Sequence, residues 1–486
     1  MCSRDYIVKR LEKTFKISLK KDVLLLGLGK SNTDLAIFFQ KAGINFSILE
    51  LKKEEEVSLK ANPKILELIN RNANIQFSAT EDQLKNALLQ SSLVVLSPSI
   101  SPLSTWGKWV KESKLPTTTE LEVAAVLTKT PLITVTGTVG KSTTANLISQ
   151  ILSQEKKVFL GGNIGIPLIN HISAELYENK RYDYGVAEAS SYQLYWSQNF
   201  LANMCLFLNF FSHHIDWHGS VFDYYIAKAS LFFRQKKNTI FILDGDDKST
   251  VSLGHNLSGR VFYFGNEPDN RDYVRKSCWF LSNKRNSVVF DAGKASEEFS
   301  LDDCALTGAH NKYNISAAVL ATKLCKASSA SIRKALKKVK PLPFRQELFT
   351  LGDITVINDS KSTTLVGTIS ALNGAVSLGF TWLIVGGILE GEFEDTFIQT
   401  VNFFKDKLVG VVFYGEKSEK LFKEFKMRDL LPSYKVNKME DAVKLLSSKV
   451  KKGQVILFSP GGSSFDEDKN FEERGKRFNQ LLKQYL

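Results

Sequence analysis

The sequence contains few cysteines and no long apolar run. Its five cysteines, Cys2, Cys205, Cys278, Cys304 and Cys325, lie far apart and form no C-x-x-C pair, which argues against a disulfide framework and a cysteine-bound zinc site. No stretch reaches the roughly 18 apolar residues of a membrane span. The first residues, MCSRDYIVKRLEKTF, lack the apolar core of a signal peptide. We therefore expect a cytoplasmic protein with reduced thiols and no membrane insertion.

Basic residues outnumber acidic ones, but they do not gather into one patch. The 64 lysines and arginines against 51 aspartates and glutamates give a formal charge of +13. The lysines occur in short clusters such as KKEEE and KALKKVK, which are typical of solvated helix faces. We expect small phosphate-bearing substrates and no nucleic-acid partner. No D-x-x-G and N-K-x-D pair is present to read guanine, which disfavours a GTPase.

Apolar strands alternate with helical patterns in three blocks of the chain. The first block has a strand, a glycine turn, a helix and a strand over residues 22–51, and the second has a strand, a loop and a helix over 131–152. The third contains the apolar segments ITVINDS, FTWLIVGG, LVGVVFYGE and QVILFSPGG. We predict an α/β fold with three parallel-sheet domains: a Rossmann-like domain at 1–120, a central P-loop ATPase-type domain at 121–341 and a Rossmann-like domain at 342–486. Ligands then bind at the carboxyl ends of the strands.

The first glycine turn, GLGKSN at residues 27–32, resembles the dinucleotide pattern G-x-G-x-x-G, with Asn32 in place of the third glycine. Glu50 follows about twenty residues later, where dinucleotide sites place a carboxylate on the ribose. These residues alone leave three interpretations open: an NAD site, a site for another nucleotide, and a tight turn without a ligand.

The second glycine-rich turn has the features of a phosphate-binding loop. The segment TVTGTVGKSTTA covers residues 134–145, although the strict pattern G-x-x-x-x-G-K-[ST] has a glycine where this chain has Val135. Backbone N–H groups at a helix start favour an anion, the lysine can reach ATP phosphates, and the serine can hold magnesium. The candidate ATP contacts in the loop are Gly137, Thr138, Gly140, Lys141, Ser142 and Thr143.

An acidic residue and a group of histidines follow in the same block. Glu188, at the end of the strand in VAEASSYQL, is a candidate magnesium ligand. Residues 213–218 could also bind zinc, although no cysteine is near; the candidate ligands are His213, His214, Asp216 and His218. These motifs favour an ATP-using enzyme and do not identify its reaction.

Taken together, the motifs resemble those of the Mur ligase family, the ATP-dependent amide-forming enzymes of peptidoglycan assembly. The resemblance spans nearly the whole chain, and the segments that carry it are TGTVGKST, GGNIG, EASSYQL, LNFFSHHIDWHGS followed by YIAKASLF, LTGAHNKYNISAA, PLPFRQE, NDSKSTT and SPGGSSFDEDKNFEERGKRF. The family's short phosphate loop accounts for Val135. Within the family, the G-K-S-T loop and the ending resemble the branch that adds D-glutamate.

The resemblance implies a role for each matching residue. The catalytic residues would be Lys141, Glu188, His214 and Lys228, and the magnesium ligands Ser142, Glu188, His214 and Lys228, the last as a carbamate. Further ATP contacts would be Asn311, Asn314, Arg345 and Asp359, with His310 marking the motif. Substrate contacts would be Ser31, Asn32 and Glu50 at the UDP site, Asn163 facing the muramoyl group, Ser190, Gln193, and Lys361, Thr363, Ser464 and Phe471 at the amino-acid site.

The implied reaction joins D-glutamate to UDP-N-acetylmuramoyl-L-alanine through an acyl phosphate, with ATP, two Mg²⁺ ions and a monomeric enzyme. Two positions depart from the family pattern. Glu390 stands where a lysine commonly meets the D-glutamate carboxylate, and Thr364 replaces a common asparagine. A sister ligase with another acceptor, a non-catalytic homologue that binds nucleotide or UDP-sugar, and an NAD-dependent dehydrogenase stay as alternatives.

Overall fold

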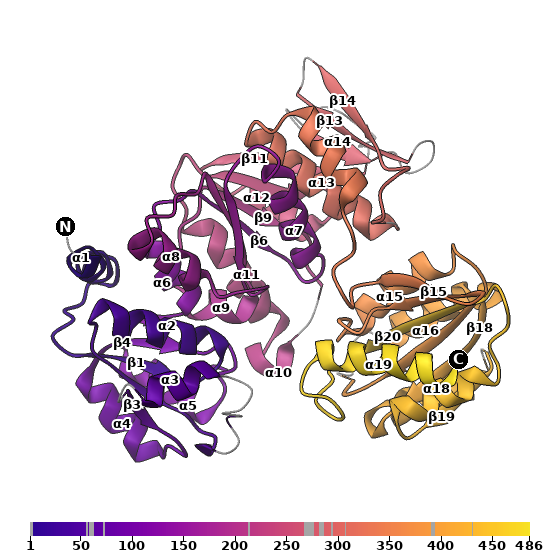
Figure 1. Cartoon of the computed structure of the whole chain (residues 1–486), viewed down its shortest axis with the longest axis horizontal. Helices are drawn as coiled ribbons and strands as arrows, with labels where there is room; N and C mark the ends of the chain where they lie inside the picture. Colours follow the sequence, from indigo (N-terminus) through magenta and orange to yellow (C-terminus); the bar gives the residue numbers. More distant parts are fainter. Residues whose placement is uncertain are drawn as a thin grey trace. The chain divides into compact units, whose positions relative to one another are not determined.

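In a computed structural model, the chain divides into two compact units (Figure 1). The first unit consists of residues 1–302 and Tyr313–Leu336, and the second of Asp303–Lys312 and Lys337–Leu486. The structure describes residues 3–54, 57, 63–70, 73–211, 214–266, 277–280, 286–292, 295–306, 308–389, 394–429 and 431–486. Within these ranges, no helix has the length and apolar character needed to cross a membrane.

A five-stranded parallel sheet opens the first unit, with the strand order β3-β2-β1-β4-β5. Its strands are β1 (Asp22–Leu26), β2 (Phe46–Leu49), β3 (Asn74–Gln76), β4 (Ser91–Leu96) and β5 (Thr117–Thr118). Its helices are α2 (Lys30–Ala42), α3 (Pro63–Asn70), α4 (Glu81–Gln90) and α5 (Thr105–Ser113). The strand order reverses at β1, so the glycine turn after β1 lies at the sheet's switch point, where ligands bind in such folds.

The second sheet of this unit has the order β14-β13-β12-β11-β10-β9-β6-β8-β7. Its strands are β6 (Leu132–Thr136), β7 (Val158–Gly162), β8 (Tyr184–Glu188), β9 (Met204–Phe207), β10 (Ile240–Asp244), β11 (Arg260–Asn266), β12 (Ser277–Phe280), β13 (Ser287–Asp291) and β14 (Ser296–Ser300). The seven strands β6 to β12 pair in parallel with their neighbours in this order, as expected. The sequence patterns do not predict the antiparallel pairing of β12, β13 and β14.

Helices connect and cover the strands of the second sheet. They are α6 (Glu120–Leu127), α7 (Lys141–Leu152), α8 (Leu168–Tyr177), α9 (Ser191–Trp196), α10 (Ile215–His218), α11 (Val221–Phe233), α12 (Lys248–Gly254), α13 (Ala309–Leu324) and α14 (Ser329–Lys338). Every residue of β4 and β6 is buried, as in parallel sheets with helices on both faces. This burial explains why their sequences read as continuous apolar runs.

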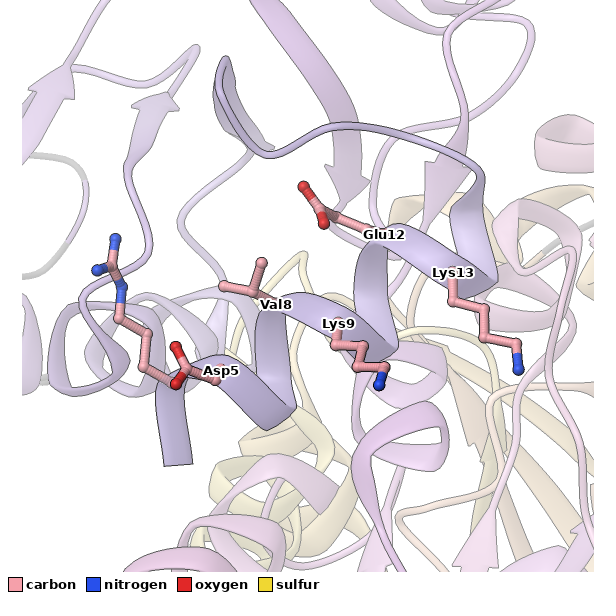
Figure 2. Close-up of a pocket in the computed structure, with 6 residues that line it drawn as sticks. Asp5, Val8, Lys9, Glu12 and Lys13 are labelled. Atoms are coloured by element: carbon pink, nitrogen blue, oxygen red, sulfur yellow. The ribbon is translucent and has the colours of Figure 1, made fainter. Parts of the chain in front are cut away.

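The N-terminal helix α1 (Ser3–Phe15) is amphipathic. Ile7, Leu11 and Phe15 are spaced four residues apart and lie buried in the core of the first unit, as one face of a helix requires. A surface hollow lies along this helix and is lined by residues of the helix alone, namely Arg4, Asp5, Val8, Lys9, Glu12 and Lys13 (Figure 2). No predicted site residue borders this hollow, which therefore gives no support for a ligand site there.

The second unit contains a six-stranded sheet with the order β15-β16-β20-β17-β18-β19. Its strands are β15 (Glu347–Leu351), β16 (Ile354–Asn358), β17 (Thr381–Gly386), β18 (Leu408–Tyr414), β19 (Ser433–Val436) and β20 (Val455–Gly461), and only β15 runs antiparallel. Its helices are α15 (Leu365–Ala375), α16 (Glu394–Phe403), α17 (Glu419–Met427), α18 (Met439–Ser447) and α19 (Phe471–Tyr485), with single turns at Lys405–Lys407 and Glu416–Ser418. The four strands predicted in this block are confirmed as β16, β17, β18 and β20.

The three sheets confirm the predicted three-domain α/β architecture. The predicted boundaries after residues 120 and 341 both fall between sheets, because β5 ends at Thr118 before β6 begins at Leu132, and β14 ends at Ser300 before β15 begins at Glu347. The boundaries themselves stay a prediction.

Candidate functional site

The phosphate loop lies at the carboxyl end of β6, between the neighbouring strands β8 and β9. This position is the switch point of the second sheet, and α7 begins directly after the loop. Gly140 has a φ of 84°, a left-handed conformation that suits glycine. A Cβ at Gly140 would lie 2.2 Å from Asn314 Oδ1, so Asn314 packs directly against the loop. No side chain caps the start of α7, which leaves its first N–H groups suited to an anion.

Asn209 holds the loop in place, and the sequence motifs do not single it out. Its Oδ1 accepts hydrogen bonds from the backbone N of Thr138 at 3.1 Å and of Val139 at 2.9 Å. Its Nδ2 donates to the carbonyl oxygen of Val139 at 3.1 Å. The available signal was its position just after β9, because the ends of neighbouring parallel strands meet at one edge of a sheet.

Ser142, Asn163 and Glu188 form a hydrogen-bonded group beside the loop. Ser142 Oγ donates to Glu188 Oε2 at 2.5 Å, and Asn163 Nδ2 donates to Glu188 Oε1 at 2.7 Å. Ser142 and Glu188 are buried, whereas Asn163 is exposed. A hydroxyl in contact with a carboxylate supplies the hard oxygen ligands that Mg²⁺ prefers. Beside substrate phosphates, Mg²⁺ is usually bound by only one or two protein carboxylates. The pair therefore fits one Mg²⁺ ion.

Two lysines lie under the loop. Lys141 Nζ donates to the carbonyl oxygens of Gly137 at 3.0 Å and Thr138 at 2.9 Å, and Lys228 Nζ donates to that of Gly137 at 2.8 Å. Lys228 is almost fully buried. Burial, reinforced by the charge of Lys141 and opposed by Glu188, lowers the pKa of Lys228 well below its usual range. The Lys228 amine is therefore far easier to deprotonate than an exposed lysine.

Aromatic rings lie close to His214 and His218, the two histidines of the predicted metal region that the structure describes. The His214 ring centroid lies 4.8 Å from that of Tyr192 and 6.0 Å from that of Tyr224. Tyr224 also donates to Thr138 Oγ1 at 3.1 Å, and Lys228 Nζ lies 4.9 Å from the Tyr224 ring centroid. His214 and Lys228 thus flank one tyrosine that contacts the phosphate loop.

The zinc interpretation gains no support. His218 Nε2 lies 3.0 Å from Ser191 Oγ, and burial lowers the pKa of His218 to about 4, so this histidine is a neutral core residue. His213 and the side chain of Asp216 lie outside the described residues. Across the described ranges, no three His, Cys, Asp or Glu side chains gather as metal ligands.

The first glycine turn is braced by its own predicted site residues. Buried Glu50 accepts from the backbone N of Leu28 at 2.6 Å and of Lys52 at 3.0 Å. Buried Asn32 donates from Nδ2 to the carbonyl oxygens of Leu26 at 3.0 Å and Gly27 at 2.9 Å. Both side chains therefore shape the turn, and their contact with a nucleotide stays a prediction.

Other residues around the turn differ in exposure. Ser31 is half-buried beside exposed Lys30, whose Nζ donates to the carbonyl oxygen of Gly165 at 2.6 Å. Gly165 belongs to the same loop as Asn163, which contacts Glu188. The two glycine turns are thus linked within the first unit through residues 163–165.

Three further predicted residues occupy helix positions in the first unit. Ser190 caps α9 and forms a reciprocal capping box with Gln193, both buried. This local pairing accounts for their sequence pattern without a ligand. Thr143 is half-buried in the first turn of α7.

The predicted nucleotide residues of α13 are two asparagines. Asn314 Oδ1 accepts from Thr144 Oγ1 at 3.2 Å, next to the phosphate loop. Asn311, one turn earlier, is buried. His310 hydrogen-bonds Gln346, and burial lowers the pKa of His310 to about 4. The structure therefore brings Asn314 to the loop and gives His310 a packing role.

In the second unit, Asp359 follows β16 and is buried. Its Oδ1 accepts from the backbone N of Gln346 at 3.1 Å, and its Oδ2 accepts from Ser459 Oγ at 2.9 Å. Burial raises the pKa of Asp359 to about 7, although these hydrogen bonds and the charge of Arg345 oppose the rise. The carboxylate thus ties the PLPFRQE segment to the ends of β16 and β20.

The predicted amino-acid contacts follow β16 and β20: Lys361 and Thr363 lie on the loop after β16, Ser464 lies on the loop after β20, and Phe471 begins α19. Lys361 Nζ lies 4.2 Å from the centroid of the Phe471 ring, within the range of a cation–π contact. Ser464 is buried and Thr363 is half-buried. Thr364 caps α15 by accepting from the backbone N of Gly367 at 3.1 Å. Glu390 lies outside the described residues.

Arg474 is the residue of this region that the motifs leave unassigned. It is 1% exposed and has three hydrogen bonds to the loops after β16 and β20. In the sequence it belongs to FEERGKRF, which reads as a helix with charged faces. The signal was weak, because nothing in the local pattern distinguishes a buried arginine from its exposed neighbours.

Comparisons with known proteins show which family and which relatives this chain is similar to. Residues 135–322 match the family model described as the Mur ligase middle domain. A UDP-N-acetylmuramoylalanine–D-glutamate ligase of Syntrophus aciditrophicus is 30% identical over 467 residues, covering 95% of this chain and 98% of that protein. The ligase of the same name from Elusimicrobium minutum is 32% identical over 477 residues, with coverages of 95% and 98%.

Solved structures share the fold at low identity. A pseudomurein peptide ligase type C from Methanothermus fervidus has a TM-score of 0.58 at 14% identity, covering 96% of this chain and 100% of that chain. A UDP-N-acetylmuramate-alanine ligase from Thermotoga maritima has a TM-score of 0.58 at 17% identity, covering 96% and 99%. The MurF ligase of Thermotoga maritima, solved with ADP, has a TM-score of 0.56 at 17% identity, covering 83% and 91%.

Proposed function

This chain belongs to the Mur ligase family, and we propose that it is the ATP-dependent ligase that joins D-glutamate to UDP-N-acetylmuramoyl-L-alanine in peptidoglycan synthesis. Full-length relatives at 30% and 32% identity that carry this name support the assignment. The structural observation that carries it is the buried contact of Ser142 with Glu188 beside a phosphate loop. We also propose that the enzyme acts as a cytoplasmic monomer.

The residues around the phosphate loop would carry the activation step. Mg²⁺, held by Ser142 and Glu188, would offset the repulsion between the substrate carboxylate and the ATP phosphates. Lys141 and the N–H groups at the start of α7 would bind the phosphates and stabilise charge that develops on them. They would orient the γ-phosphate for attack by an oxygen of the L-alanyl carboxylate, which gives an acyl phosphate and releases ADP.

The second half of the reaction is amide formation. The amine of D-glutamate attacks the acyl carbon, loses a proton, and phosphate leaves with its bond to carbon broken. Lys361 and Phe471, which lie in contact, are the proposed side chains for the acceptor, together with Ser464 and Thr363. Lys361 would attract the acidic acceptor. Glu390, which stands at a common lysine position of the family pattern, would repel that acceptor if it occupied the same place.

A second Mg²⁺ site at His214 and Lys228 depends on the chemical state of the lysine. An ammonium group is no ligand for a cation, whereas a carbamate offers anionic oxygens of the kind Mg²⁺ prefers. The low pKa of buried Lys228 supports this modification, because only the neutral amine attacks CO₂. The donor set therefore fits a second ion only in the carbamylated form.

Oxygen-18 in the L-alanyl carboxylate of the UDP substrate tests the proposal. After turnover with ATP and D-glutamate, one labelled oxygen should appear in inorganic phosphate, because the carboxylate oxygen bonds to phosphorus and leaves with it. Label in AMP, or no label in phosphate despite amide formation, contradicts the acyl-phosphate route. Label transfer with a different amino acid only would favour a sister ligase.

A further inference from the structure

We propose that Arg474 is a positioning residue of the acceptor site: it holds the loops after β16, β17 and β20 in one arrangement and so sets the affinity for the acidic acceptor. The proposal rests on the proposed function, because it concerns the binding of that acceptor. Arg474 is not one of the predicted substrate contacts. Its side chain is buried and does not reach a substrate itself.

The guanidinium group of Arg474 hydrogen-bonds two loops at once. Nε donates to Ser360 Oγ at 3.1 Å, and Nη2 donates to the carbonyl oxygen of Ser360 at 2.7 Å. Nη1 donates to the carbonyl oxygen of Gly462 at 2.9 Å. Ser360 directly precedes the predicted acceptor contact Lys361, and Gly462 lies two residues before the predicted contact Ser464. The backbone positions of both contacts therefore depend on this one side chain.

A third loop closes over the same group. Gly387, directly after β17, has a φ of 84°, and a Cβ there would lie 2.9 Å from Arg474 Nη1 and 2.4 Å from the carbonyl oxygen of Ser463. This position requires glycine for both its backbone conformation and the space. The loops at the carboxyl ends of β16, β17 and β20 thus meet at the guanidinium.

Ser360 extends the connection to the aromatic contact of the acceptor site. Its hydroxyl accepts from Arg474 Nε and donates to the carbonyl oxygen of Phe471 at 2.9 Å. Phe471 begins α19, and its ring lies 4.2 Å from Lys361 Nζ. One hydroxyl therefore connects Arg474 to the pair that we assign to the acceptor.

The geometry explains why the residue is arginine. A planar guanidinium directs N–H groups to separate oxygens in a fixed fork, whereas a lysine ammonium is a single point on a flexible stem. Hydrogen bonds from a charged donor are stronger than neutral ones, so the loss of two of the three would loosen the loops. Lysine at this position could replace one bond and not the set.

The test compares R474K and R474A with wild type in steady-state assays of ADP release. We expect the KM for D-glutamate to rise about tenfold in R474K and further in R474A, with the KM values for ATP and the UDP substrate within twofold of wild type. Added guanidinium, at a non-denaturing concentration, should lower the KM of R474A for D-glutamate again, whereas methylammonium should not. The matched control K476A removes an exposed cation from the same helix and should keep the wild-type KM.

The outcomes separate this proposal from the proposed function. Wild-type protein without D-glutamate-dependent turnover would overturn the proposed function itself. Wild-type turnover, with an unchanged D-glutamate KM in folded R474K, would overturn the positioning role alone. If R474A does not fold, S360A serves as the second variant, because it removes the Nε acceptor and should raise the same KM severalfold. A rise in all three KM values would indicate general unfolding and would also overturn the proposal.

Discussion

Replacing Glu188 by glutamine should separate catalysis from stability. The carboxylate accepts from Ser142 Oγ at 2.5 Å and from Asn163 Nδ2 at 2.7 Å. Glutamine keeps the shape of the side chain but replaces one carboxylate oxygen by an NH₂ group. A hydrogen bond to a charged acceptor, worth about 1.5–3 kcal/mol, is therefore lost or replaced by a bond to a neutral acceptor. Relief of a buried charge offsets part of this cost. We expect the free energy of unfolding to fall by only about 1–2 kcal/mol.

Activity should fall much further in E188Q. Loss of one group that stabilises developing charge typically lowers kcat by about 100- to 1000-fold, or roughly 2.7–4 kcal/mol. ADP release under saturating substrates measures kcat, and urea unfolding measures stability. The matched control is E175Q, because Glu175 accepts from the hydroxyls of Thr128 and Thr130 away from the loop. A kcat of E188Q within tenfold of wild type, or an equal loss in E175Q, would refute the reasoning.

Three further predictions concern the first unit. Burial raises the pKa of Glu120 from 4.5 to about 8, so its contribution to stability is full below pH 4.5 and is lost as pH rises towards 8. Between these values, urea unfolding should show wild type losing about 1.4 kcal/mol per pH unit relative to E120Q; equal slopes would contradict the assignment. N209A frees two loop N–H groups and should weaken ATP binding about tenfold or more by calorimetry. Unchanged affinity would show that the loop does not need this clamp. G140A places a Cβ 2.2 Å from Asn314 Oδ1 and should abolish ATP binding in folded protein; wild-type affinity would contradict the described loop.

The sequence predicts the fold well where local periodicity carries the information. Buried parallel strands such as β4 and β6 read as apolar runs, and glycine turns mark their carboxyl ends. The strand–loop–helix order then places Ser142 and Glu188 at one edge of the second sheet, where they are in contact. The motif and the topology were enough for this part of the site.

The sequence does not reveal contacts made by single side chains across long separations. Asn209 clamps a loop 70 residues earlier, and Arg474 binds Ser360 across 114 residues. Neither contact leaves a local period or a spacing that a motif could show. The same limit applies to Glu50, whose spacing predicts a ribose contact and does not reveal that its carboxylate also accepts a hydrogen bond from the backbone N of Leu28 in the first glycine turn.

The most direct test of the central claim is ADP release with Mg·ATP, UDP-N-acetylmuramoyl-L-alanine and a panel of amino acids, with the product identified by mass spectrometry. The account predicts turnover that requires both the UDP substrate and D-glutamate, and a product heavier by one glutamyl residue. Turnover with another amino acid in preference to D-glutamate would contradict the acceptor. No turnover with any acceptor, in protein that binds ATP, would contradict the ligase activity.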